Sequence, residues 1–151
     1  MSGAALLIAL LLAAPGTPAT VPDPAPRRLV AGQRAAIDVL FPPWQFTGTF
    51  TLAFGGRADQ GVARDRGSLV GPTQRVERVL EGKHGTITLR LDTRLRGAIY
   101  PPIVGRWQVM GATGAWAGLR GGGTFTSVDA GGREGSPFER QTLLGRLSLG
   151  P

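Results

Sequence analysis

Residue types that commonly perform catalysis are sparse in this chain of 151 residues. His84 is the only histidine, and the chain has no cysteine. A Ser-His-Asp arrangement would have to use His84, yet no Gly-x-Ser-x-Gly turn is present. One histidine among scattered carboxylates does not make a zinc site. We therefore expect no metal ion and assign no catalytic residue, and we place His84 in a solvated turn.

Carboxylates could serve as acid or base if one were buried or if two lay close together. The candidates are Asp38, Glu77, Glu81 and Asp92. Asp92 follows Leu89 and Leu91 in an alternating segment, so it should point outward, toward Arg90 or Arg94. The facing of Glu77 is open, and an inward Glu77 or Arg90 would favour an enzyme.

Glycines near residues 111–114 and 121–123 invite comparison with phosphate-binding loops. A dinucleotide fingerprint needs a helix directly after its glycines and a long strand-helix-strand continuation. About thirty residues follow the second glycine cluster, and they resemble strands. No Gly-Lys-Ser/Thr is present either. We expect no cofactor, and interpret residues 105–126 as two strands joined by a turn in which Trp116 and Leu119 form a plug.

The net charge of +7 raises the question of an anionic partner. Lys83 is the only lysine among 17 basic residues, and many arginines stand beside acids, as in Arg64-Asp65-Arg66 and Arg75-Val76-Glu77-Arg78. This scatter indicates a solvated surface and no nucleic-acid partner. Contact with acidic polymers of a cell envelope stays open as an alternative.

Alternation of apolar and polar residues dominates the rest of the chain. In residues 46–54, Phe46, Phe50, Leu52 and Phe54 share one face, and in residues 86–92 the inward set is Ile87, Leu89 and Leu91. A turn at residues 82–85 joins the latter segment to a strand at residues 74–80. Further strands are expected near residues 36–40, 61–64, 106–110, 124–128 and 141–149. Six to eight short strands predict an all-β protein with one antiparallel closed barrel of about eight strands.

Three segments follow from composition. Residues 1–19 resemble a signal peptide, because the apolar run from Ala4 to Ala14 is too short to span a bilayer and small residues end at Ala19. Residues 20–34 form a Pro-rich linker, and residues 35–151 form the barrel domain. We predict export, to the medium, the periplasm or the cell envelope. No stable membrane span should remain once the signal is removed.

The block from Gly105 to Thr126 joins a Trp-bearing strand, Gly-x-x-Gly, an aromatic residue, Ala-Gly-Leu and Gly-x-Gly-Thr-Phe. With Gly48-Thr-Phe-Thr and Gly85-Thr-Ile-Thr upstream, it resembles bacterial exported proteins with an allene oxide cyclase-like or dirigent-like barrel. Trp116 stands where a Tyr or Phe is commoner in that family. The resemblance implies an eight-stranded barrel with an apolar cavity, often in homotrimers. Plant members act on lipophilic substrates, but their polar functional residues have no clear counterpart here.

The expected function is therefore binding of a small lipophilic molecule in an apolar lumen, without catalysis. The predicted lining is Phe50, Phe54, Leu89, Trp107 and Trp116. One alternative is an isomerase or cyclase that acts on an apolar substrate in the same lumen. The other is a structural or interaction protein with a packed interior, whose arginines contact acidic envelope polymers.

Overall fold

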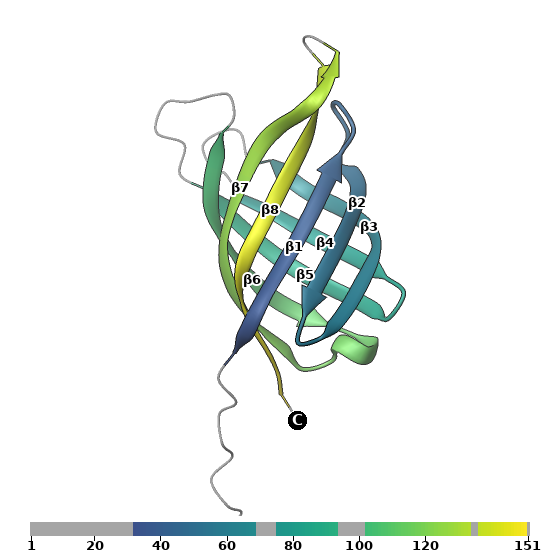
Figure 1. Ribbon diagram of the computed structural model, residues 1–151, viewed down its shortest axis with the longest axis vertical. Coiled ribbons are helices and arrows are strands. Elements are labelled where there is room, and N and C mark those ends of the chain that lie inside the picture. The colour runs from purple at the N-terminus through teal and green to yellow at the C-terminus, as the bar shows by residue number, and fades with distance from the viewer. Residues whose placement is uncertain (1–31, 69–74, 94–101, 134–135, 151) are drawn as a thin grey trace, which may run out of the picture.

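The computed structural model describes residues 32–68, 75–93, 102–133 and 136–150, where eight antiparallel strands form one closed barrel (Figure 1). The strands are β1 (Gln33–Phe41), β2 (Thr47–Phe54), β3 (Arg57–Ser68), β4 (Arg75–Gly82), β5 (Gly85–Thr93), β6 (Ile103–Ala112), β7 (Leu119–Arg133) and β8 (Ser136–Leu149). A 3₁₀ turn, η1 (Gly114–Trp116), lies between β6 and β7. Each strand pairs with the next, and β8 closes on β1. The predicted fold class is thus confirmed.

The barrel begins at Gln33, two residues before the predicted domain boundary. The predicted signal peptide, residues 1–19, and all but the last three residues of the predicted linker lie outside the described ranges. Among the helical segments that are described, none is long and apolar enough to cross a membrane.

Alternation determines which side chains enter the barrel. Along β2 every second residue is buried, and Phe50, Leu52 and Phe54 point inward while threonines face solvent. The inward placement predicted for Phe46 is wrong, since this side chain is 64% exposed. The strand starts at Thr47, so Phe46 belongs to the preceding loop and its carbonyl accepts the Asp65 N–H at 2.8 Å.

The β4–β5 hairpin forms at the predicted turn, where Gly82 and Gly85 are register partners. Gly85 has a φ of +142°, a backbone conformation that side chains other than hydrogen disfavour. Beyond the turn, Ile87, Leu89 and Leu91 are buried, as predicted. Alternation therefore carries the outward residues of β5, including Asp92, onto the barrel wall.

Large aromatic side chains at the middle of the barrel face glycines on neighbouring strands. A Cβ on Gly145 would lie 2.8 Å from Cζ2 of Trp107, and one on Gly105 would lie 2.8 Å from Cζ of Phe125. Both distances are far shorter than ordinary carbon contacts. Glycines at 105 and 145 thus leave room for the rings of Phe125 and Trp107 and for the backbone carbonyls of Asp92 and Gly122, which a Cβ at these positions would also meet.

The two ends of the barrel differ. At one end, which we call the plug end, η1 lies against the β4–β5 turn, where the Ala115 N–H donates to the His84 carbonyl at 2.8 Å (Figure 1). The opposite end, called the far end, carries the loop between β1 and β2. Because neighbouring strands are antiparallel, the last residues of β1, β3 and β7 share the far end with the first residues of β4 and β8.

Candidate functional site

All five residues predicted to line the lumen lie inside the barrel. Phe50, Phe54, Leu89, Trp107 and Trp116 expose between 0 and 6% of their surface. They belong to the same buried apolar cluster, so the structure brings them together as the alternation suggested. They pack against protein side chains here, and their contact with a ligand remains a prediction.

Trp116 closes the plug end from inside. Its ring lies 6.4 Å, centre to centre, from that of Phe54, and its indole Nε1 donates a hydrogen bond to Asp59 Oδ2 at 2.9 Å. The predicted plug is thus confirmed, with an acid that the sequence reading did not assign to it.

Asp59 is a buried acceptor that holds the β4–β5 turn against this plug. Its Oδ1 accepts the backbone N–H groups of Gln60 and Lys83, each at 2.9 Å, and its Oδ2 also accepts that of His84 at 3.2 Å. Burial raises the pKa of this carboxyl, but the hydrogen bonds from Trp116 and the three backbone N–H groups outweigh it and lower the pKa overall. His84 lies in the turn, half exposed, with Nδ1 3.4 Å from Oδ1. These bonds give Asp59 a structural role.

A second set of polar side chains enters the interior near the far end. Arg78 on β4 is fully buried and makes a bidentate pair with Asp65 on β3, with Nε–Oδ1 at 2.6 Å and Nη2–Oδ2 at 2.7 Å. The guanidinium carbon also lies 4.9 Å from the ring centre of Phe41 on β1. Its third nitrogen, Nη1, is buried and has no hydrogen-bond partner.

The other half of this set comes from β7 and β8. Glu139 Oε1 accepts hydrogen bonds from the hydroxyl of Ser127 and, at 2.7 Å, from Nε2 of Gln141. Ser127 and Gln141 are buried, and the Gln141 Oε1 atom has no hydrogen-bond partner. We call Asp65, Arg78, Ser127, Glu139 and Gln141 the polar cluster.

Strand register brings the two halves of the polar cluster to the same end. Glu139 is the partner of Phe41, whose ring lies against the Arg78 guanidinium, and Gln141 is the partner of Val39 on the same strand. One orphaned donor and one orphaned acceptor thus lie toward the far end of the interior, on the opposite walls that β4 and β8 form. The cluster combines one arginine with two carboxylates, so its formal charge is −1.

The sequence did not lead us to the charged side chains that point inward. Glu77 and Arg90, whose inward facing would have favoured an enzyme, both face outward. Arg78 and Asp65 were interpreted as surface charges. The signal was present, since Arg78 alternates with buried Val76 and Leu80, and Asp65 lies two residues from buried Ala63.

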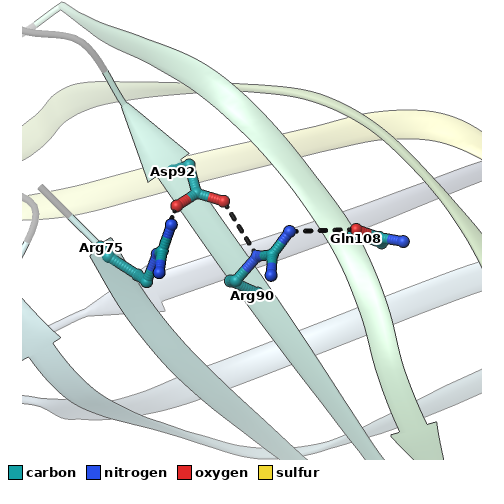
Figure 2. Close-up of polar contacts among 4 residues, drawn as sticks. All are labelled: Arg75, Arg90, Asp92 and Gln108. Atoms are coloured by element: carbon teal, nitrogen blue, oxygen red, sulfur yellow. Dashed lines mark hydrogen bonds and ion pairs between the residues drawn. The ribbon is translucent and has the colours of Figure 1, made fainter.

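Figure 2 shows a chain of polar contacts on the outer wall of β4, β5 and β6. Asp92 accepts Arg75 Nε at 2.6 Å and Arg90 Nε at 3.0 Å, and Arg90 Nη2 donates to Gln108 Oε1 at 3.2 Å. The hydrogen bond from Arg75, together with the positive charges of Arg75 and Arg90, lowers the pKa of Asp92 despite partial desolvation. The predicted outward facing of Asp92 beside Arg90 is confirmed. These groups are solvated, and such pairs contribute little to stability.

A groove of about 460 Å³ lies on the outer wall of β1, β2 and β3, beside the β4–β5 turn. Its lining includes Asp38, Thr51, Asp59, Lys83 and His84. Asp59 is already bound by four N–H groups, and Asp38 accepts the hydroxyl of Thr142 at 2.8 Å. The polar cluster, by contrast, holds buried polar atoms without partners, and these are the atoms that native proteins rarely leave unused.

Nowhere in the described ranges do three His, Asp or Glu side chains converge as metal ligands would. Comparison of the chain with protein-family models, with curated proteins and with solved structures finds no match. The resemblance to allene oxide cyclase-like and dirigent-like barrels therefore rests on the motif residues alone.

Proposed function

We propose that this barrel binds a small, mainly apolar molecule that carries one neutral polar group, and that the polar cluster receives this group. The observation that supports the proposal is the pair of buried atoms without partners, the donor Nη1 of Arg78 and the acceptor Oε1 of Gln141. Binding sites for small molecules commonly combine apolar walls with a few such convergent polar groups.

The charge of the polar cluster indicates which polar group it would take. Asp65 already neutralises Arg78, and Glu139 adds a negative charge. An anionic ligand would meet a net charge of −1 in a poorly solvated place, which is costly. A hydroxyl or a primary amide can accept from Arg78 and donate to Gln141. An apolar alcohol is therefore the simplest ligand class.

The five residues predicted to line the lumen would contact the apolar part of the ligand. Since their side chains are packed, a ligand would displace some of them or bind nearer the far end, beside Phe41 and Ile103, which are also buried. Export of the protein and assembly into homotrimers, as the resemblance implies, are proposals of the same standing. Sedimentation of the purified chain would measure the second of these.

The test compares binding of a long-chain alcohol with binding of its parent hydrocarbon and the matching carboxylic acid, by native mass spectrometry and calorimetry of the full chain. The key variant, Arg78→Met with Asp65→Leu, removes the buried ion pair together, so no lone charge is left inside. The matched control, Arg64→Met with Glu81→Leu, removes an exposed pair on the same two strands. We expect the alcohol to lose about 10- to 100-fold in affinity only in the first variant, since a hydrogen bond to a charged group contributes about 1.5–3 kcal/mol. Equal binding of alcohol and hydrocarbon, or no binding of either, would contradict the proposal.

An isomerase or cyclase remains the second candidate because two carboxylates, Asp65 and Glu139, face inward. Both oxygens of Asp65 are held by Arg78, whereas the hydrogen bonds described for Glu139 use only Oε1. Glu139 Oε2 is thus the group that could move a proton. Conversion of a bound alcohol or epoxide that Glu139→Gln abolishes, with binding retained, would establish catalysis.

A further inference from the structure

Four arginines on the outer wall follow one another over four neighbouring strands. Arg34 lies on β1, Arg146 on β8, Arg120 on β7 and Arg106 on β6, and all four are exposed. We call these four residues the basic band. Their positions come from strands at the two ends of the chain, so the band exists only once β8 closes on β1.

Strand register places three members of the band close together and the fourth farther along the wall. Arg34 and Arg146 are direct cross-strand partners, and Arg146 pairs with Gly122, two residues from Arg120. Direct partners have Cβ atoms about 5 Å apart and diagonal ones about 7–8 Å apart. Arg106 pairs with Thr124, four residues from Arg120, so about 14 Å of strand separates these two arginines.

The positive charges of the band are not paired with described carboxylates, unlike those of four arginines elsewhere on the wall. On β3 to β5, Arg64, Arg66, Arg75 and Arg90 each lie within 4.0 Å of a carboxylate oxygen. The described residues form six ion pairs, and none of these six includes a member of the band. Like charges directly opposite each other destabilise a sheet. The Arg146 guanidinium donates to the backbone carbonyl of Gly32 at 2.9 Å, which is a neutral partner and leaves the positive charge of the pair in place.

The shape and the neighbours of the band indicate one class of partner. Four strands of an eight-stranded barrel turn through about half a circle, so a flat bilayer or stiff duplex DNA would contact one or two of them. A flexible chain can follow the curve. Single-stranded nucleic acid would need aromatic side chains for stacking, whereas the band is interleaved with Gln108, Thr124 and Ser148, which can hydrogen-bond to sugar hydroxyls.

We propose that the basic band binds a flexible acidic polysaccharide laid across β1, β8, β7 and β6, with successive anionic groups contacting successive arginines. This proposal is independent of the polar cluster inside the barrel. It makes the outer wall of these strands an attachment surface and leaves the ion-paired wall of β3 to β5 free.

The test measures binding of the full chain to a polymer of uronic acid at several NaCl concentrations. Arg34→Gln with Arg146→Gln removes two charges from the band. Arg64→Gln with Arg66→Gln removes the same two charges from ion-paired positions on β3 and is the matched control. At low salt we expect the band variant to bind about 5- to 30-fold more weakly and the control to change less than 2-fold, with wild-type affinity falling as salt rises.

Three results would overturn the proposal. The first is an equal loss in both variants, which would mean that total charge alone governs binding. The second is tighter binding to a single-stranded oligonucleotide or to anionic vesicles than to the polysaccharide. The third is absence of binding to the polymer at 20 mM NaCl by a chain whose thermal unfolding shows that it is folded.

Discussion

Replacing Asp59 by Asn should show that one buried carboxylate holds the plug end together. The carboxylate accepts four N–H groups, two on each oxygen. An amide keeps one oxygen and presents an NH₂ group to the other two donors. Each buried donor left without a partner costs about 1–3 kcal/mol. We therefore expect Asp59→Asn to lower the free energy of unfolding by about 2–4 kcal/mol at pH 7.

The pH dependence of stability provides a second, independent test of this prediction. The pKa of Asp59 is lowered in the folded protein relative to its ordinary value of 3.8, so its ionised form stabilises the fold above that pH. The stabilisation is lost as the pH falls through the lower, folded-state pKa. The difference between wild type and Asp59→Asn should thus be complete at pH 6–7 and shrink below pH 4.

Urea unfolding followed by tryptophan fluorescence at pH 7, 5 and 3 would measure both effects. Asp92→Asn is the control, because Asp92 also has a lowered pKa but is exposed, and we expect it to cost at most about 1 kcal/mol. Repeating the series with His84→Gln removes the imidazole whose Nδ1 lies 3.4 Å from Asp59 Oδ1. The reasoning would be refuted if Asp59→Asn and Asp92→Asn lowered the free energy of unfolding equally. It would also be refuted if the difference in this free energy between wild type and Asp59→Asn stayed constant down to pH 3.

Three further predictions concern stability. Asp65→Ala should lower the free energy of unfolding by about 3–5 kcal/mol, because it leaves the buried Arg78 guanidinium without its counter-charge. For Arg78→Met with Asp65→Leu, the free energy of unfolding measured in urea should lie within about 1 kcal/mol of the wild-type value. Trp44→Asn should raise stability by about 1 kcal/mol, since Trp44 has a φ of +58° and is 85% exposed, and Asn tolerates this conformation; a lower melting temperature would contradict this. Gly145→Ala should cost about 1–3 kcal/mol, because its Cβ would overlap the Gly122 carbonyl oxygen as well as approach Trp107, and a companion Trp107→Phe change should recover little of the loss since the backbone contact remains; full recovery would contradict this.

The strands could be predicted because their information is local. In β5, apolar residues at every second position determine both the extended conformation and the buried face, and Ile87, Leu89 and Leu91 are buried accordingly. Turn residues at 82–85 determine where the β4–β5 hairpin reverses. The outward facing of Asp92 follows from the same period of two.

The polar cluster was missed because a charged residue on an apolar face is ambiguous in sequence. Arg78 shares the inward face with Val76 and Leu80, but a lone arginine is normally excluded from an interior unless a carboxylate meets it. Asp65 meets it from another strand, 13 residues away, through the β3–β4 register. Asp59 and Trp116 are 57 residues apart, and no local pattern connects them.

Sequence alone determined where most strands lie, which side chains point inward along them, and that the protein is an all-β barrel; β3, β7 and β8, at 12, 15 and 14 residues, are longer than the short strands predicted. Only the tertiary structure decided which distant residues meet, namely Arg78 with Asp65, Trp116 with Asp59, and Arg34 with Arg146. The physical reason is that side-chain facing depends on a period of two within one strand, whereas partnership depends on register between strands. Closure of β8 on β1 sets that register for residues more than one hundred positions apart.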